Sequence, residues 1–277
     1  MHPDPAALLP FAHELADLAG PLAKQWFRHA DSGIERKQDA TPVTIADREI
    51  ERVLRERIAT AHPEHGILGE EHGSQQLDAE YVWVLDPIDG TKAFASGNPL
   101  FGTLIGLWHR GRPVLGVLDA PALGERYYAA TGHGAHRRVG SSPPERLAVA
   151  KSDELSDAVL YCTTPDGLRE HAGHAALRER VRWTSYGADC IAYALLAAGS
   201  CSLIVDTTLQ PYDWCALVPI IEEAGGVVRD FAGNKLRLEG GDGTLVAAAT
   251  APLLRATLQT LTGGTGRPAG GTDASGA

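Results

Sequence analysis

The chain has 277 residues, of which 44% are apolar and 22% charged, so it can bury one large core or two moderate ones and has the composition of a soluble globular protein. The formal net charge of −10 argues against nucleic-acid binding, which usually needs a basic face. No apolar stretch reaches membrane-spanning length, and no signal peptide is evident at the N-terminus.

The four cysteines indicate a reducing compartment. No two of them have the Cys-x-x-Cys spacing, and each lies in or beside an apolar run, so we interpret them as reduced packing residues. Together with the missing signal and membrane segments, this predicts a cytoplasmic protein.

Two helices are predicted at the start of the chain. Apolar residues recur at three- and four-residue steps over 8–26, which predicts an amphipathic helix with a packing role. A polar loop over 34–42 contains Lys37, and a second helix is predicted to open at Thr44. Thr44 and Asp47 have the spacing of a capping box, so the residues alone favour a capping role for Asp47.

Two adjacent acids follow the next apolar run. Residues 67–69 predict a short strand, and Glu70 and Glu71 come directly after it. Such a pair is most often part of a solvated turn, and on its own it does not indicate a site.

A more specific pattern follows the apolar run Tyr81–Leu85, which predicts a buried strand. The strand is expected to stop at Asp86, with a second carboxylate at Asp89 and a turn at Gly90 and Thr91 that opens a helical turn. Carboxylate oxygens suit Mg²⁺, and N–H groups at a turn suit phosphate. The pattern therefore suggests a metal-assisted phosphate site, with a capped turn after an edge strand as the alternative.

The remaining pattern divides the chain into two halves. Apolar runs at 102–108, 114–118 and 126–130 predict a strand meander, so residues 1–140 are expected to form an α+β half. Further strands are expected at 147–150, 158–162, 181–185, 202–206, 227–228 and 245–249, and helices at 167–180, 189–198, 213–224 and 252–261. Their alternation predicts an α/β half over 141–262, and the composition of 263–277 predicts a disordered tail.

The run Asp-Pro-Ile-Asp-Gly-Thr-x-x-Phe at 86–94 resembles the signature of the inositol monophosphatase family of Mg²⁺-dependent phosphatases. Other segments resemble that family in the same order: Thr-x-Ala-Asp at 44–47, Gly-Glu-Glu at 69–71, and Tyr-Asp at 212–213 with Glu-Ala-Gly-Gly at 223–226. The resemblance spans residues 6 to 262. It implies a layered α-β-α-β-α sandwich of the inositol monophosphatase and fructose-bisphosphatase type, and a homodimer.

The resemblance also implies roles for individual residues. Two or three Mg²⁺ ions would be held by Glu70, Asp86, the carbonyl of Ile88, Asp89 and Asp213. Asp47 would hold Thr91, and Thr91 and Glu70 would position a water for in-line attack on phosphorus. Backbone N–H groups of Gly90 and Thr91 would bind phosphate oxygens. Glu71 and Lys37 are weaker candidates for the site.

The substrate is indicated by a segment of the second half. Gly-x-Asp-Cys-x-Ala-Tyr at 187–193, with Pro-Tyr-Asp at 211–213, resembles the histidinol-phosphatase branch of the family. Asp189 and Asp206 are the expected substrate contacts, since carboxylates pair with a cationic substrate, although Asp189 alone could equally be a helix cap. The alternatives are an inositol-1-monophosphatase, a bisphosphate nucleotidase or fructose-bisphosphatase of the same fold, and a catalytically silent phosphate-binding relative.

Overall fold

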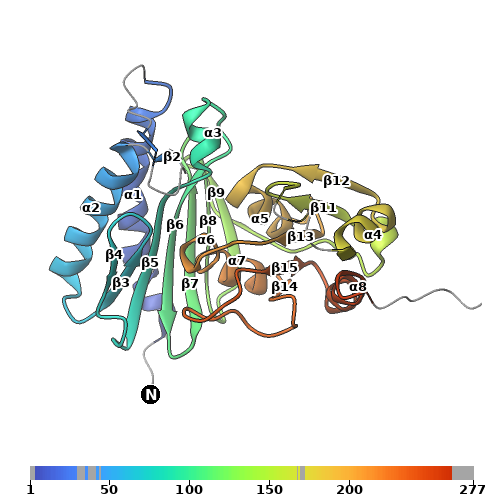
Figure 1. The fold of residues 1–277 in the computed structure, drawn as a ribbon. Coiled ribbons are helices and arrows are strands. Elements are labelled where there is room, and N and C mark those ends of the chain that lie inside the picture. The colour runs from blue at the N-terminus through green and yellow to red at the C-terminus, as the bar shows by residue number, and fades with distance from the viewer. Residues whose placement is uncertain are drawn as a thin grey trace, which may run out of the picture.

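Two β-sheets alternate with three layers of helices (Figure 1). The structure is a computed structural model that describes residues 4–29, 35–36, 42–43, 45–166, 168 and 172–263. Lys37, Thr44 and all but the first residue of the predicted tail lie outside these ranges. The layered α-β-α-β-α arrangement confirms the predicted fold class.

The first layer is a pair of packed helices, α1 (Leu9–Trp26) and α2 (Ile45–Ala61), and a single 3₁₀ turn at Pro5–Leu8 precedes them. Their apolar stripes bury Leu15, Ile50, Leu54 and other side chains against the outer face of the first sheet. Helix α1 begins and ends within one residue of its predicted range, and α2 begins one residue after its predicted start, because the three- and four-residue spacing of their apolar residues matches a helix that packs on one face.

The first sheet has eight strands in the spatial order β10-β9-β8-β7-β6-β5-β3-β4. Their bounds are β3 Gly66–Gly69, β4 Gly73–Gln75, β5 Tyr81–Asp89, β6 Gly102–His109, β7 Arg112–Ala120, β8 Glu125–Ala130, β9 Ala135–Val139 and β10 Glu145–Arg146. A short helix, α3 (Thr91–Ala95), follows β5, and β1 (Glu35–Arg36) and β2 (Pro42–Val43) form a separate pair. The sheet is antiparallel except where β3 and β5 pair in parallel.

The predicted end of β5 at Asp86 is wrong, because the strand continues to Asp89. Its pairing with β6 changes register between Asp86 and Asp89. Pro87 lies in this irregular stretch, where its missing N–H removes no regular ladder bond. The bulge keeps both acids on the strand while the chain turns toward α3.

The second sheet has five strands in the order β12-β11-β13-β15-β14. Their bounds are β11 Val159–Cys162, β12 Trp183–Tyr186, β13 Leu203–Asp206, β14 Val227–Arg229 and β15 Leu245–Ala248. Helices α5 (Asp189–Ala197), α6 (Pro211–Trp214) and α7 (Leu217–Glu223) lie between the sheets, and α4 (Ala172–Arg180) and α8 (Ala251–Leu261) cover the far face (Figure 1). A single 3₁₀ turn precedes β11.

Two predicted elements of the second half differ from the structure. The expected strand at 147–150 does not form, because the segment crosses between the sheets and donates single hydrogen bonds to Ala135 O and Ala224 O. The expected helix at 213–224 is split into α6 and α7. Pro219 has no N–H to donate to the carbonyl four residues earlier, so the helix cannot run unbroken through the junction at Cys215.

The helices between the sheets share one apolar layer with the inner faces of both sheets. At its centre the junction of α6 and α7 lies directly on the backbone of the first sheet: a Cβ on Gly116 would be 1.8 Å from Ala216 O. Glycine is required at that position, and the close approach brings α6 onto β5 and β6. In the part of the chain that the structure describes, no helix is long and apolar enough to cross a bilayer.

Candidate functional site

Acidic residues gather where β3 and β5 end. These strands are parallel neighbours, and the Glu70 N–H donates to Leu85 O at 3.3 Å, so Glu70 lies beside the strand that carries Asp86 and Asp89. Because parallel strands end at the same edge of a sheet, this pairing brings the acids that follow β3 and those at the end of β5 close together.

The third acid comes from the second half of the chain. Asp213 lies in the first turn of α6, and its Oδ2 accepts the Gln210 N–H at 2.6 Å in a capping box. The N-cap of α6 is Gln210, and Asp213 is the N3 residue of the helix. One carboxylate oxygen each of Asp86, Asp89 and Asp213 lies within 4.8 Å of the others. Residues more than 120 positions apart in the chain thus meet at one point.

The electrostatics of this cluster favour a bound cation. Burial raises the pKa of Asp86 well above its usual range, and Glu70, Asp89 and Asp213 raise it further. Burial also raises the pKa of Asp89 well above its usual range and that of Asp213 to about 7. Asp86 is only 2% exposed, and its Oδ1 has no hydrogen-bond partner among the described residues. Converging carboxylates with an oxygen left over match the all-oxygen ligand set of Mg²⁺.

The turn after β5 is built as predicted. Gly90 takes the left-handed conformation at φ 86°, which a side chain would disfavour, and α3 starts at Thr91. The Thr91 hydroxyl donates to Ile88 O at 3.2 Å. Asp47, buried in the first turn of α2, lies close enough to Asp86 to raise the pKa of that acid. Its predicted contact with Thr91 stays a prediction.

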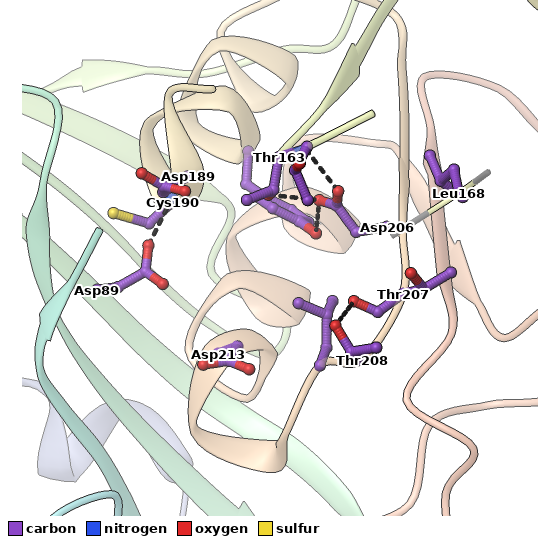
Figure 2. A pocket seen from close by; sticks show the side chains of 12 residues that line it. Asp89, Thr163, Leu168, Asp189, Cys190, Asp206, Thr207, Thr208 and Asp213 are labelled. Carbon is purple, nitrogen blue, oxygen red and sulfur yellow. Dashed lines mark hydrogen bonds between the residues drawn. The ribbon is translucent and has the colours of Figure 1, made fainter. Parts of the chain in front are cut away.

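A cavity of about 220 Å³ opens beside the acidic cluster (Figure 2). It is lined by Asp89, Thr163, Thr164, Leu168, Asp189, Cys190, Tyr193, Asp206, Thr207, Thr208, Leu209 and Asp213. Four carboxylates and four threonine hydroxyls dominate this lining, and none of its described residues is a lysine or an arginine. The cavity therefore suits a polar, positively charged group.

Asp189 lies between the cavity and the Gly90 turn. Its Oδ2 would be 3.1 Å from a Cβ on Gly90, and the Cys190 N–H donates to Asp89 Oδ2 at 2.6 Å. Ala188 is the N-cap of α5, so the capping alternative for Asp189 is wrong. Both Ala188 and Asp189 have positive φ, 73° and 40°, a strained backbone of the kind that functional sites retain. Burial raises the pKa of Asp189, and Lys92 opposes that shift.

Asp206 lines the cavity but its oxygens already have protein partners. Oδ1 accepts the Thr163 N–H at 2.7 Å, and Oδ2 accepts the hydroxyls of Thr163 at 3.2 Å and Tyr193 at 2.8 Å (Figure 2). Burial raises its pKa to about 6, against the effect of these bonds. The sequence gives no role to Thr163 and includes Tyr193 only in the 187–193 pattern, because a single polar group beside or within an apolar run carries no signal of a distant partner.

Glu71 lies beside the cluster with its side chain 4% exposed, and its Oε2 is 4.0 Å from Arg48 Nε. Its charge helps to raise the pKa of Tyr212, after burial and the closer acids Asp213, Glu70 and Asp86. Its side chain faces the same acidic region as Glu70, and its role in the site stays a prediction.

A separate group of His62, Glu64 and His65 does not form a comparable metal site, although its ligand atoms lie within 4.8 Å of one another. The two imidazole rings are stacked, with centroids 4.6 Å apart and an interplanar angle of 8°, so one ion cannot lie in both ring planes. Trp83 Nε1 donates to His65 Nδ1 at 3.1 Å, which places the ring proton on Nε2, the nitrogen that faces Glu64.

Known proteins are similar to this chain over most of its length. A model of the inositol monophosphatase family matches residues 4–262. A chloroplastic bifunctional phosphatase of Arabidopsis thaliana is 41% identical over 238 residues, covering 84% of this chain and 67% of that protein. A histidinol-phosphatase of Chlorobaculum parvum is 36% identical over 234 residues, covering 84% and 89%. The structure of an inositol monophosphatase from Zymomonas mobilis has a TM-score of 0.83 at 35% identity, covering 94% of this chain and all of that one.

Proposed function

The chain belongs to the inositol monophosphatase family, and within it we propose a Mg²⁺-dependent phosphomonoesterase that hydrolyses L-histidinol phosphate to L-histidinol and phosphate. The observation that carries the choice of substrate is the acidic cavity beside the metal-type cluster. Its described lining residues include four carboxylates and no basic side chain, whereas histidinol carries an ammonium group and an imidazole.

The proposed metal ligands are Glu70, Asp86, Asp89, Asp213 and the carbonyl of Ile88. The orphaned Oδ1 of Asp86 and the converging carboxylates support this set, and two or three Mg²⁺ ions are the proposed number. Bound Mg²⁺ would lower the pKa of a water, orient the phosphate and neutralise charge on the leaving oxygen.

The chain's own groups would do the positioning. Glu70 and Thr91 would accept hydrogen bonds from the attacking water and fix its direction, with Asp47 orienting Thr91. The N–H groups of Gly90 and Thr91 would donate to the phosphate oxygens, where the left-handed turn leaves them free of strand pairing. The reaction needs no covalent phosphoenzyme.

Asp189 would bind the cationic part of the substrate. Its carboxylate lies next to Gly90, so a cationic group bound to Asp189 would lie beside the Gly90 turn, where the phosphate is proposed to bind. Asp206 would add negative charge to the opposite wall while it holds Thr163 in place. Inositol phosphate is the second candidate, because the hydroxyls of Thr163, Thr164, Thr207 and Thr208 could pair with a polyol.

Turnover of four substrates in Mg²⁺ tests the proposal: histidinol phosphate, inositol 1-phosphate, fructose 1,6-bisphosphate and 3′,5′-bisphosphoadenosine. We expect the highest kcat/KM for histidinol phosphate. Asp189→Asn should reduce that value about 30-fold or more, as expected for a lost desolvated charge pair, and should leave inositol 1-phosphate turnover much less affected. The matched control is Asp157→Asn, which changes an exposed acid outside the cavity.

A preference for inositol 1-phosphate that survives in Asp189→Asn would contradict the histidinol phosphate proposal. Inactivity toward every phosphomonoester at saturating Mg²⁺ would instead support a silent phosphate-binding relative. We further propose a homodimer, following the family resemblance, which light scattering after size exclusion would check. The proposed cytoplasmic location follows from the four free, buried cysteines.

A further inference from the structure

A buried carboxylate on α2 supports the turn that carries Glu70. Glu51 lies one helical turn after Asp47 and is 0% exposed. Its Oε2 accepts the Glu71 N–H at 2.7 Å, and its Oε1 accepts the His72 N–H at 3.1 Å. These are the first two backbone groups after Glu70, so one side chain fixes the exit of the turn.

The entry of the turn also rests on this carboxylate. A Cβ on Gly69 would lie 2.0 Å from Glu51 Oε1, so only glycine lets the end of β3 pass over it. Arg55 Nε donates to the same Oε1 at 2.7 Å, and Arg55 Nη2 also donates to Gly73 O. The guanidinium therefore balances the buried charge of Glu51 and closes the turn from its far side.

Glu70 is held between these two supports. Its own N–H bonds to Leu85 O on β5, and the next two N–H groups bond to Glu51. With all three N–H groups of 70–72 fixed, the Glu70 backbone has little freedom to move its carboxylate away from Asp86 and Asp213.

We propose that Glu51 is a positioning residue for the reaction, which sets the Glu70 carboxylate for metal and water through the N–H groups of Glu71 and His72. This inference rests on the proposed role of Glu70. Glutamine in place of Glu51 would turn one acceptor into an NH₂ group facing N–H donors, so the turn would lose a support without losing volume.

Two readouts of Glu51→Gln test the inference. Supports of metal ligands change metal affinity or activity by about 10- to 100-fold when removed, and we expect a change of that size in the Mg²⁺ concentration that half-saturates the rise in melting temperature. At saturating Mg²⁺, kcat should fall while KM for the phosphomonoester stays within about twofold, because the cavity walls are untouched. Glu56→Gln is the matched control, since Glu56 is exposed on the same helix and its carboxylate accepts a hydrogen bond from Arg52 at 2.7 Å.

A double-mutant cycle with Glu70→Gln separates positioning from general stability. If Glu51 acts through Glu70, adding Glu51→Gln to Glu70→Gln should lower kcat by less than about twofold. Full additivity of the two losses would overturn the inference, and so would an unchanged Mg²⁺ midpoint in a folded Glu51→Gln protein. A wild type whose melting temperature does not respond to Mg²⁺ would refute the metal role of Glu70 and the inference with it.

Should Glu51→Gln not fold, Arg55→Met perturbs the same support from a side chain that is 16% exposed. It should raise the Mg²⁺ midpoint as well. A lower melting temperature with an unchanged midpoint would show that the Glu51 and Arg55 pair only stabilises the fold, and would overturn the inference.

Discussion

Replacing Asp213 by asparagine should make the metal-free protein more stable while abolishing its response to Mg²⁺. The amide keeps an oxygen to accept the Gln210 N–H, so the capping box of α6 survives. It removes one negative charge from a cluster in which Asp86 and Asp89 lie within 4.8 Å. The substitution thus isolates the electrostatic cost of the site from its hydrogen bonding.

The size of the effect follows from the pKa of Asp213, which burial and the nearby acids raise from 3.8 to about 7. The folded protein then binds this proton more tightly than the unfolded chain, so ionisation destabilises the fold. The cost is absent below about pH 4, grows up to about pH 7 and is constant above it. At about 1.4 kcal/mol for each pH unit between the two values, it reaches about 4 kcal/mol.

Thermal unfolding at pH 5 and pH 8, in EDTA and separately in Mg²⁺, measures this electrostatic cost. Each kcal/mol corresponds to about 2–4 °C in a chain of this size, so Asp213→Asn should melt about 8 °C or more above wild type at pH 8, with a much smaller gain at pH 5. Mg²⁺ at 100 times its Kd should stabilise wild type by about 2.7 kcal/mol and the variant far less. A variant that melts at or below wild type at pH 8 would refute the electrostatic account, provided that Asp157→Asn is unchanged.

Three further substitutions test other parts of the structure. Asp89→Asn should abolish phosphatase activity while the circular dichroism spectrum stays that of wild type, and substantial residual turnover would contradict its ligand role. Gly116→Ala would place a methyl 1.8 Å from a carbonyl oxygen, so urea unfolding should show a loss of about 1–3 kcal/mol or more, unlike Gly241→Ala at an open position. Tyr193→Phe removes a hydrogen bond that favours the ionised form of Asp206, whose pKa is about 6. The free energy of unfolding should therefore fall by about 1–3 kcal/mol at pH 8 and by less at pH 5. An equal loss at both pH values would argue against that bond.

The fold was most predictable where a local pattern was strong. The helices over 9–26 and 45–61 follow from the spacing of their apolar residues, and the strand at 81–85 follows from a continuous apolar run. Strand β9, by contrast, has the sequence Ala-His-Arg-Arg-Val and was missed, because pairing with β8 rather than its own apolar pattern makes it a strand. Its strand character depends on a neighbour that sequence periodicity cannot show.

The residues of the site could be predicted from the sequence, but their arrangement in space could not. The acids at 86 and 89 follow from their place at a strand end, but the approach of Asp213 depends on Gly116 and the α6–α7 junction, contacts with no local signature. Only the resemblance to a family placed Asp213 in the site beforehand. The roles of Thr163 and Glu51 were not predicted at all, since their partners lie far away in the chain: Thr163 donates to the Asp206 carboxylate, and the Glu51 carboxylate accepts the Glu71 N–H.

The buried acids of this site differ in the number of hydrogen bonds that their carboxylates accept. Asp206 accepts three protein hydrogen bonds and Glu51 accepts three, so both are satisfied without a ligand and support the backbone around the site. Asp86 is as deeply buried, yet its Oδ1 has no donor among the described residues and its acidic neighbours add repulsion. Because an unsatisfied buried carboxylate is costly, either a proton or a bound cation has to neutralise it, and a cation would also give the unpaired oxygen a partner. The same imbalance that destabilises the metal-free fold therefore favours cation binding at this end of the sheet, where we propose Mg²⁺.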